Sequence, residues 1–351
     1  MKTKINLLKT FLNLKVGLEN FGVFDGKKVF CWCDGFYISV PLESGLDKTF
    51  ATNLKEFVRV ADGKDNLDFE LHEESESIKI KFKRTRFKIP SISLEQTQEE
   101  LDLSDAKSID FANSNIFLDN LKKAEKFMAV KDIRSYLEGV SIKGSEMGAS
   151  NGCIAILIKD CGLDIGQNIV IPRVAVEFLI KTKLTLKTIF VSEVNGNKAN
   201  RISFQFENGE IFSSPLIDQS FPDLSSAVFI NEKLQVNELP QTEFFDALRE
   251  LKAQDKGVGV RLSPTQIEIQ ENVVNGTVEA TVEIDLPGMI EDVGFRLEYL
   301  LTLENLSPKL FYTQEEVDSV LTAFSEDKNL LVALMPVRLW GDKNVCISFS
   351  K

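Results

Sequence analysis

The sequence predicts an α+β protein in which one domain, with two helices and an antiparallel sheet, occurs three times. The first observation is a short apolar helix followed by three strands, which starts near Ala51, Ile171 and Phe295. These starts are 120 and 124 residues apart, which is the size of a small domain and not of a solenoid repeat. The second observation is the length of 351 residues, which suits two or three cores. The hydrophobic content of 43% favours folded cores over disorder.

The clearest copy of this motif lies at residues 168–183. A β-branched run ends at Pro172, and an apolar helix opens at Arg173 with Phe178 and Leu179 toward one side. Proline is well placed in a first turn because that N–H has no partner within the helix.

The first domain is predicted over 1–96. It opens with a short strand, MKTKI, and continues as a helix with Leu8, Leu12 and Val16 at helical spacing. Asp-Gly pairs at 25–26 and 34–35 indicate hairpin turns, and a helix is expected over 53–60. The polar, acidic stretch 96–105 is interpreted as the first linker.

The second domain is predicted over 106–224 and the third over 228–351, with a linker between Phe221 and Leu234. A helix over 117–139 opens the second domain, and a helix over 242–256 opens the third. Asn151 and Gly152 form a strong hairpin signal between two strands of the second domain.

Composition excludes several classes. No run approaches the roughly 18 apolar residues of a membrane span, and the basic N-terminus lacks an apolar signal region, so a cytoplasmic protein is expected. The five cysteines are scattered without a partner pair at metal-ligand spacing. The net charge of −12 argues against general adhesion to nucleic acid, but it leaves room for a local basic face.

Catalytic patterns are missing from the sequence. The single histidine, His72, lies in a polar stretch, and no nucleophile elbow, phosphate-binding loop or zinc-protease motif occurs. The glycines of GVGVRL, 257–262, are interpreted as a turn. We therefore expect no enzyme activity and no cofactor or metal. The alternative is a nucleic-acid-processing enzyme or a monomeric binding module on the same repeated domain, and a measurement of molecular mass separates a monomer from a ring.

Five blocks carry a resemblance to a known family. The blocks AEKFMAVKDIRSYLEGVSI, IVIPRVAVEFLI, FSSPLIDQSFPDL, GVGVRL and MPVRL follow one another in the order and spacing of the bacterial DNA polymerase III β subunit, the DNA sliding clamp. The first domain resembles this family mainly through TFATNLKEFVRVADG and TRFKIPSI. The resemblance implies the DNA clamp fold, and a head-to-tail homodimer whose six domains form a ring around duplex DNA. It also implies a scaffold that tethers the polymerase, the clamp loader and other partners through short linear peptides.

Lysine is concentrated on the repeated helices of this acidic protein. Such a face contacts phosphates without reading bases, which permits sliding along double-stranded DNA of any sequence. The candidates are Lys9, Lys15, Lys122, Lys123, Lys126, Lys131, Arg173, Lys181, Lys183, Arg249 and Lys252. The third domain is the weakest part of this pattern, because acidic residues alternate with its basic ones.

The resemblance also implies where two chains meet. Phe87 and Ile89 of the first domain are expected to contact Leu251, on the opening helix of the third domain of the other chain.

A peptide-binding pocket is implied between the second and third domains. Its expected lining is Arg134, Leu137, Ser150, Gly152, Cys153, Ile154, Pro222, Tyr299, Val317, Ser319, Met335, Pro336, Val337, Arg338 and Leu339. Cys153 and Ile154 replace the family's usual His-Arg pair, and Arg296 replaces a small polar residue. These departures predict a preference for a different, more acidic peptide.

The tail departs most from the family, which typically ends at the position of Leu339. Twelve further residues follow, WGDKNVCISFSK. Their alternation predicts a strand over 345–350 that returns along the C-terminal strand, with Trp340 at the pocket rim.

Overall fold

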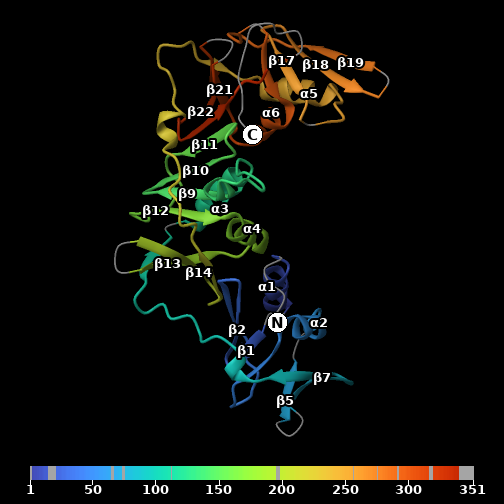
Figure 1. Ribbon diagram of the computed structural model, residues 1–351, viewed down its shortest axis with the longest axis vertical. Helices are drawn as coiled ribbons and strands as arrows, with labels where there is room; N and C mark the ends of the chain where they lie inside the picture. Colours follow the sequence, from blue (N-terminus) through green and yellow to red (C-terminus); the bar gives the residue numbers. More distant parts are fainter. Residues whose placement is uncertain are drawn as a thin grey trace. The chain divides into compact units, whose positions relative to one another are not determined.

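The chain divides into two compact units. The N-terminal unit comprises residues 1–121 and 165–220, and the C-terminal unit comprises 122–164 and 221–351. Figure 1 shows the elements of both units in a computed structural model. The structure describes residues 2–14, 21–64, 67–72, 76–111, 113–194, 198–255, 257–274, 276–290, 292–315 and 319–339. Within these ranges, no helix is long and apolar enough to cross a membrane.

One antiparallel sheet of eleven strands runs through the N-terminal unit. Its strand order is β5-β6-β7-β4-β1-β2-β3-β15-β14-β13-β8. The bounds are β1 (Phe21–Phe24), β2 (Lys28–Cys33), β3 (Phe36–Pro41), β4 (Phe50–Asn53), β5 (Asp68–His72), β6 (Ser77–Phe82), β7 (Thr85–Ile92), β8 (Lys107–Asp110), β13 (Leu186–Val194), β14 (Lys198–Phe206) and β15 (Ile211–Pro215).

Three helices pack together in the N-terminal unit: α1 (Lys2–Leu12), α2 (Leu54–Ala61) and α4 (Arg173–Thr182). α1 contacts both α2 and α4. Aromatic rings join α1 and α4 to the sheet, because Phe178 stacks on Phe212 at 3.9 Å between ring centroids and Phe11 meets both rings edge-on at 6.4 Å. Strand β12 (Asn168–Pro172) leads into α4.

The C-terminal unit holds two sheets. Seven strands follow one another in the order β9-β10-β11-β23-β22-β21-β16, and four form the sheet β19-β18-β17-β20. The bounds are β9 (Gly139–Lys143), β10 (Glu146–Ser150), β11 (Ile154–Ile158), β16 (Asn237–Glu238), β17 (Gly259–Leu262), β18 (Gln266–Val273), β19 (Gly276–Glu283), β20 (Val293–Arg296), β21 (Leu310–Thr313), β22 (Leu321–Ser325) and β23 (Leu330–Leu334).

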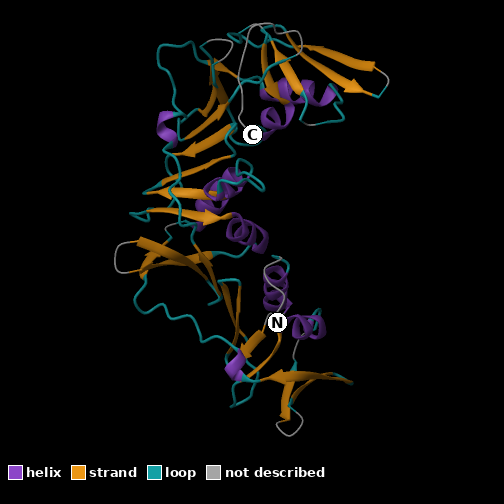
Figure 2. Ribbon diagram, viewed as in Figure 1, coloured by secondary structure: helices purple, strands orange, loops and turns teal. Residues whose placement is uncertain are grey.

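The helices of the C-terminal unit include α5 (Gln241–Glu250) and α6 (Leu297–Thr302), which contact each other. Helix α3 (Ser114–Glu125) spans the sequence boundary at which the two units meet. Figure 2 distinguishes these helices, in purple, from the strands. The described residues also include the 3₁₀ turns η2 (Leu94–Gln96), η3 (Ser135–Glu138) and η4 (Leu224–Ser226).

The predicted helix followed by three strands is confirmed at all three places. Helix α2 precedes β5, β6 and β7; α4 precedes β13, β14 and β15; and α6 precedes β21, β22 and β23. A strand enters each helix, and in the first copy the Asn53 side chain caps it by accepting the Glu56 N–H at 3.2 Å. The boundaries between the two compact units fall inside the predicted second domain. The division into three domains therefore stays a prediction.

Several element predictions are wrong. Residues 2–5 belong to α1 and not to a strand, because Ile5 and Leu8 are buried on the same face as Phe11. The helix expected over 117–139 ends at Glu125. The second half of GVGVRL is strand β17, which pairs with β18 and β20. The predicted strand over 345–350 lies outside the described residues.

Truncation of Phe212 tests the core of the N-terminal unit. Phe212 is fully buried and touches the rings of Phe11 and Phe178. Phe212→Ala should lower the free energy of unfolding by about 3–5 kcal/mol, the usual cost of a buried phenylalanine, as measured by urea denaturation. Phe229→Ala, at an exposed phenylalanine, is the matched control and should change it by less than about 0.5 kcal/mol. Equal effects of the two substitutions would contradict this description of the core.

Candidate functional site

The described residues of the predicted pocket all belong to the C-terminal unit, and the turn between β10 and β11 organises them. The Asn151 side chain accepts the N–H groups of Cys153 and Ile154, both at 2.9 Å. The Ser150 hydroxyl accepts the Gly152 N–H at 3.0 Å and donates to the Ile154 carbonyl at 2.8 Å. The turn predicted from Asn151 and Gly152 is therefore confirmed, and its backbone is fixed by side chains.

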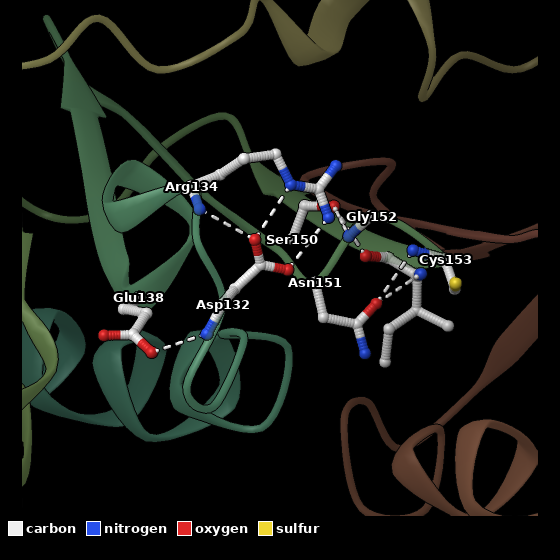
Figure 3. Close-up of polar contacts among 8 residues, drawn as sticks. Asp132, Arg134, Glu138, Ser150, Asn151, Gly152 and Cys153 are labelled. Atoms are coloured by element: carbon white, nitrogen blue, oxygen red, sulfur yellow. Dashed lines mark hydrogen bonds and ion pairs between the residues drawn. The ribbon is translucent and has the colours of Figure 1, made fainter. Parts of the chain in front are cut away.

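Arg134 lies against this turn and is held by Asp132 (Figure 3). Its Nε and Nη2 donate to the two carboxylate oxygens of Asp132, both at 2.9 Å. The Asp132 N–H in turn donates to Glu138 at 2.8 Å. Sequence reasoning selected Arg134 but missed Asp132 and Glu138, although the Asp-x-Arg spacing was a usable signal.

Gly152 makes room for the guanidinium. Its φ of +92° lies in the left-handed region, and a Cβ there would come within 2.9 Å of Arg134 Nη2. Both the backbone conformation and the close approach therefore require glycine.

Cys153 connects the turn to the C-terminal strand and to α6. Its carbonyl accepts the Met335 N–H at 2.9 Å. Burial and the neighbouring Cys153 raise the pKa of Tyr299 to about 12. The Arg296 guanidinium lies 5.7 Å from the centroid of the Tyr299 ring, which is cation–π distance.

The final described residues pack against strand β20. The Val337 N–H donates to the Gly294 carbonyl at 2.9 Å, and Leu339 is buried. A Cβ on Gly294 would meet the Leu339 side chain at 2.4 Å, so this glycine admits the leucine.

The remaining pocket candidates fall into four groups. Leu137, Ile154 and Pro336 are buried, whereas Pro222 and Arg338 are exposed. Ser319 is half-buried and lines a separate cavity of about 200 Å³ together with Ala227 and Phe229. Val317 and residues 340–351 lie outside the described residues.

The arrangement offers cations beside apolar surface. Arg134, Arg296 and Arg338 are all exposed; Arg134 lies against Gly152, and Arg296 lies over the ring of Tyr299. Among the described residues, no three His, Cys, Asp or Glu side chains gather in a way that could hold a metal ion. Such a surface is suited to anchor an apolar side chain beside a carboxylate.

Many of the basic helix residues already have acidic neighbours. Lys9 pairs with Asp62 at 2.8 Å, and Glu177 lies between Arg173 and Lys181 at 3.6 and 2.8 Å. Exposed pairs of this kind contribute about 0–1 kcal/mol, so a phosphate can compete for them. Arg249 contacts Asp246 and Glu304, as expected from the mixed charge of the third domain.

The other basic candidates are mostly exposed. Lys183 and Lys252 follow α4 and α5 with φ of 54° and 51°, so each places a positive charge at a helix C-terminus. Lys122, Lys126 and Lys131 are exposed and Lys123 is half-buried, whereas Lys15 lies outside the described residues.

The three expected dimer residues differ in exposure, and their place in an interface stays a prediction. Ile89 and Leu251 are each only 4% exposed, so their own chain already covers them. Leu251 continues the buried face of α5 that contains Phe244 and Leu248. Only Phe87, which is half-buried, keeps surface for a second chain.

Comparison with solved structures gives matches over nearly the whole chain. The DNA polymerase sliding clamp from Pseudomonas aeruginosa with ligand matches with a TM-score of 0.76 at 18% identity, over 96% of this chain and 98% of that chain. The Bacillus subtilis sliding clamp matches at 0.75 and 16%, over 96% and 97%. The Helicobacter pylori β clamp bound to a DNA ligase peptide matches at 0.74 and 16%, over 95% and 97%.

No protein-family model matches the chain, and no curated protein does. The chain therefore has the α+β fold of the bacterial DNA polymerase III β sliding clamps over nearly its full length, at low sequence identity.

Titration of Asp132 tests the Arg134 contact. The hydrogen bonds from Arg134 lower the Asp132 pKa from 3.8 to about 2. Because the pKa of this carboxyl is lower in the folded protein than in the unfolded chain, ionised Asp132 stabilises the fold at pH values above 3.8. This contribution is lost as the pH falls from about 4 toward 2. Arg134→Ala removes the side-chain hydrogen bonds, which are the largest cause, and keeps the backbone N–H bond, so it should raise the Asp132 pKa part of the way toward 3.8 in an NMR titration. Asp102, whose pKa is lowered by Ser104, is the internal control and should not move. An Asp132 pKa unchanged in the variant would exclude Arg134 as the cause.

Proposed function

We propose that this protein is a DNA sliding clamp, a homodimeric ring that encircles duplex DNA and tethers a polymerase, a clamp loader and other partners through short peptides. The shared fold supports this role. The observation that carries it is a strand-pairing pattern that is used twice within the chain and leaves a third pair of strand edges available to another chain.

Two strand pairs join successive repeats. Strand β3 pairs with β15, where Ile38 lies opposite Phe212. Strand β11 pairs with β23, where Ile156 lies opposite Val332. All four of these side chains are 0% exposed. Each of these two strand pairings therefore buries one apolar cross-strand pair completely.

The third repeat has an equivalent of the first member of each pair. Ile38 and Ile156 each pair across their hairpin with the residue seven positions earlier, and Val278 in β19 does the same.

The first repeat has an equivalent of the second member. Phe212 lies five positions before Ile217, and Val332 lies five positions before Val337. The N–H groups of Ile217 and Val337 each donate to a carbonyl of the strand that leads into the helix of the same repeat. Phe87 lies five positions before Ile92, which pairs with Ala51 in the strand ahead of α2. Phe87 and Val278 are therefore the third pair of the series.

Both strands have an edge that is unpaired among the described residues. Strand β7 pairs with β6, and only its last two residues pair with β4. Strand β19 pairs with β18 alone in the described part of the chain. Val278 is 48% exposed and Phe87 is half-buried, unlike their four fully buried counterparts. An antiparallel contact of β19 with β7 of a second chain would cover both.

Charge supports the same pairing. A cavity of about 610 Å³ beside β19 is lined by carboxylates of α5, of the end of β19 and of the loop after β19, among them Glu243, Asp246, Glu250, Glu283 and Asp285. Strands β6 and β7 and their turn carry Lys79, Lys81, Arg84, Arg86 and Lys88. In the proposed register Arg86 lies opposite Glu279. Unlike charges at the two edges favour association of different ends, which gives the head-to-tail contact that a ring needs.

The other parts of the proposal rest on the C-terminal unit and on the helices. The related Helicobacter pylori β clamp is bound to a DNA ligase peptide, which supports peptide binding at the cluster around Cys153 and Tyr299. The lysines of the repeated helices would contact DNA phosphates. A clamp with this role works in the cytoplasm and has no enzyme activity of its own.

A charge at Val278 should break the ring. Val278→Asp places a carboxylate where the proposed contact buries a valine, so the dimer should dissociate into folded monomers at micromolar concentration in sedimentation velocity. Val274→Asp, at a fully exposed valine in the neighbouring turn, is the control and should stay dimeric. A dimeric Val278→Asp protein, or a monomeric unsubstituted protein, would count against the ring.

Truncation of Met335 should weaken peptide binding and leave the ring intact. Met335 is half-buried and adjoins Cys153, so Met335→Ala removes apolar surface from the proposed pocket. We expect at least a tenfold loss of affinity for a polymerase-derived clamp-binding peptide in fluorescence anisotropy. Phe229→Ala changes a large exposed side chain outside the cluster and should have no effect. Unchanged affinity in the Met335 variant, with the dimer preserved, would rule out this pocket.

A further inference from the structure

The N-terminal unit contains a second small cavity, of about 190 Å³. Its apolar lining comes from β1 and β2, mainly Val23, Phe30 and Trp32. Thr97 and Gln98, which follow β7 in the chain, form its polar rim. None of these residues belongs to the peptide pocket or to the ring contact described above.

The segment over this cavity is held in place by two contacts. The Trp32 Nε1 donates to the Glu99 carbonyl at 2.7 Å, and Lys28 pairs with Glu100. The Arg201 guanidinium lies 5.0 Å from the centroid of the Trp32 ring, and one of its nitrogens donates to the Ser213 hydroxyl at 3.1 Å. The indole is therefore fixed in position as one wall of the cavity.

The first and second repeats fill this place differently. Phe30 and Gly148 are equivalent, since each pairs with the residue nine positions later in the next strand. In the second repeat Leu224, from the segment after β15, packs so closely on Gly148 that a Cβ there would lie 2.9 Å from it. In the first repeat Phe30 has a side chain of its own, and Leu101 from the segment after β7 packs against the cluster that contains Phe30. The cavity is the space that these side chains leave beside Trp32, Thr97 and Gln98.

Charge identifies the kind of molecule. The segment after β7, which lines the cavity, exposes Glu95, Glu99 and Glu100, of which Glu100 pairs with Lys28, and Leu94 adds exposed apolar surface. This acidic rim contrasts with the arginines around Tyr299. A peptide with basic residues on both sides of an aromatic side chain matches both the charge and the apolar lining.

We propose that the cavity formed by Val23, Phe30, Trp32 and Thr97 is a second docking site, which takes an aromatic side chain of a lysine- or arginine-rich peptide. The site does not depend on the ring or on the peptide pocket of the C-terminal unit. A clamp with both sites would hold two partners of opposite charge on one chain.

Fluorescence of Trp32 gives a direct test. The chain has two tryptophans, so Trp340→Phe leaves Trp32 as the single reporter in the full-length protein. The probe is the synthetic peptide Lys-Lys-Phe-Lys-Lys, with Lys-Lys-Gly-Lys-Lys and Glu-Glu-Phe-Glu-Glu as controls. We expect a saturable change of Trp32 fluorescence with the first peptide alone, weakened by added salt.

Two variants separate the cavity from its charged rim. Thr97→Phe fills the cavity from within and should abolish the signal. The double substitution Glu95→Lys and Glu99→Lys should weaken binding at least tenfold, whereas Glu326→Lys, at an exposed glutamate of the C-terminal unit, should not. No signal at millimolar peptide, equal binding of the acidic peptide, or full affinity in the Thr97 variant would overturn the proposal.

Discussion

The rest of this structure depends on backbone pairing between successive repeats. In each pairing, the last strand of one repeat lies beside β3 or β11 of the preceding repeat. Five residues of β11 pair with β23, and three residues of β3 pair with β15. Each backbone hydrogen bond contributes only about 1 kcal/mol net, but a buried donor left without a partner costs about 1–3 kcal/mol. The chain makes this pairing twice. The corresponding strands at its two ends are β7, the equivalent of β15 and β23, and β19, the equivalent of β3 and β11, and in the described residues these two are not paired with each other. Long unpaired edges attract other strands, and pairing of these two between chains would satisfy both without leaving a new edge.

The two sites at which we propose partner binding differ in charge because their neighbouring segments differ. Exposed Arg134 and Arg296 adjoin the C-terminal cluster at Gly152 and Tyr299, whereas exposed Glu95, Glu99 and Glu100 belong to the segment that lines the cavity at Trp32. Both sites arise from the same part of the repeated hairpin, since Trp32 and Ser150 each pair with the residue five positions later. A repeated fold can therefore present two different surfaces without a change in its backbone. With a net charge of −12, most of the surface repels DNA. The lysines that follow α4 and α5 are exceptions to this negative charge.

Local features of the structure could be predicted from the sequence, and long-range ones could not. The helix after Pro172 and the turn at Asn151 follow from local chemistry, and both are confirmed. The prediction of a strand at residues 1–5 was wrong because Ile5 was not grouped with Leu8, although the two are buried on the same face of one helix. Leu251 was assigned to an interface although its spacing from Phe244 and Leu248 is that of a buried helix face. The pairing of Ile38 with Phe212 joins residues far apart in the chain and leaves no local signal. The partner of Phe87 could therefore be inferred only after the two internal pairs were known.

The most direct test of the ring is a disulfide between the two proposed edge residues. Directly opposed residues of an antiparallel pair lie within disulfide reach. Protein carrying Phe87→Cys and Val278→Cys would be diluted with nicked circular plasmid, oxidised and denatured in SDS. The ring predicts a covalent dimer that stays on the circular DNA and is released when the plasmid is cut once. A protein with Phe87→Cys and Val274→Cys is the control and should not form this linkage. Failure to crosslink, open polymers of more than two chains, or equal retention on circular and cut DNA would contradict the ring.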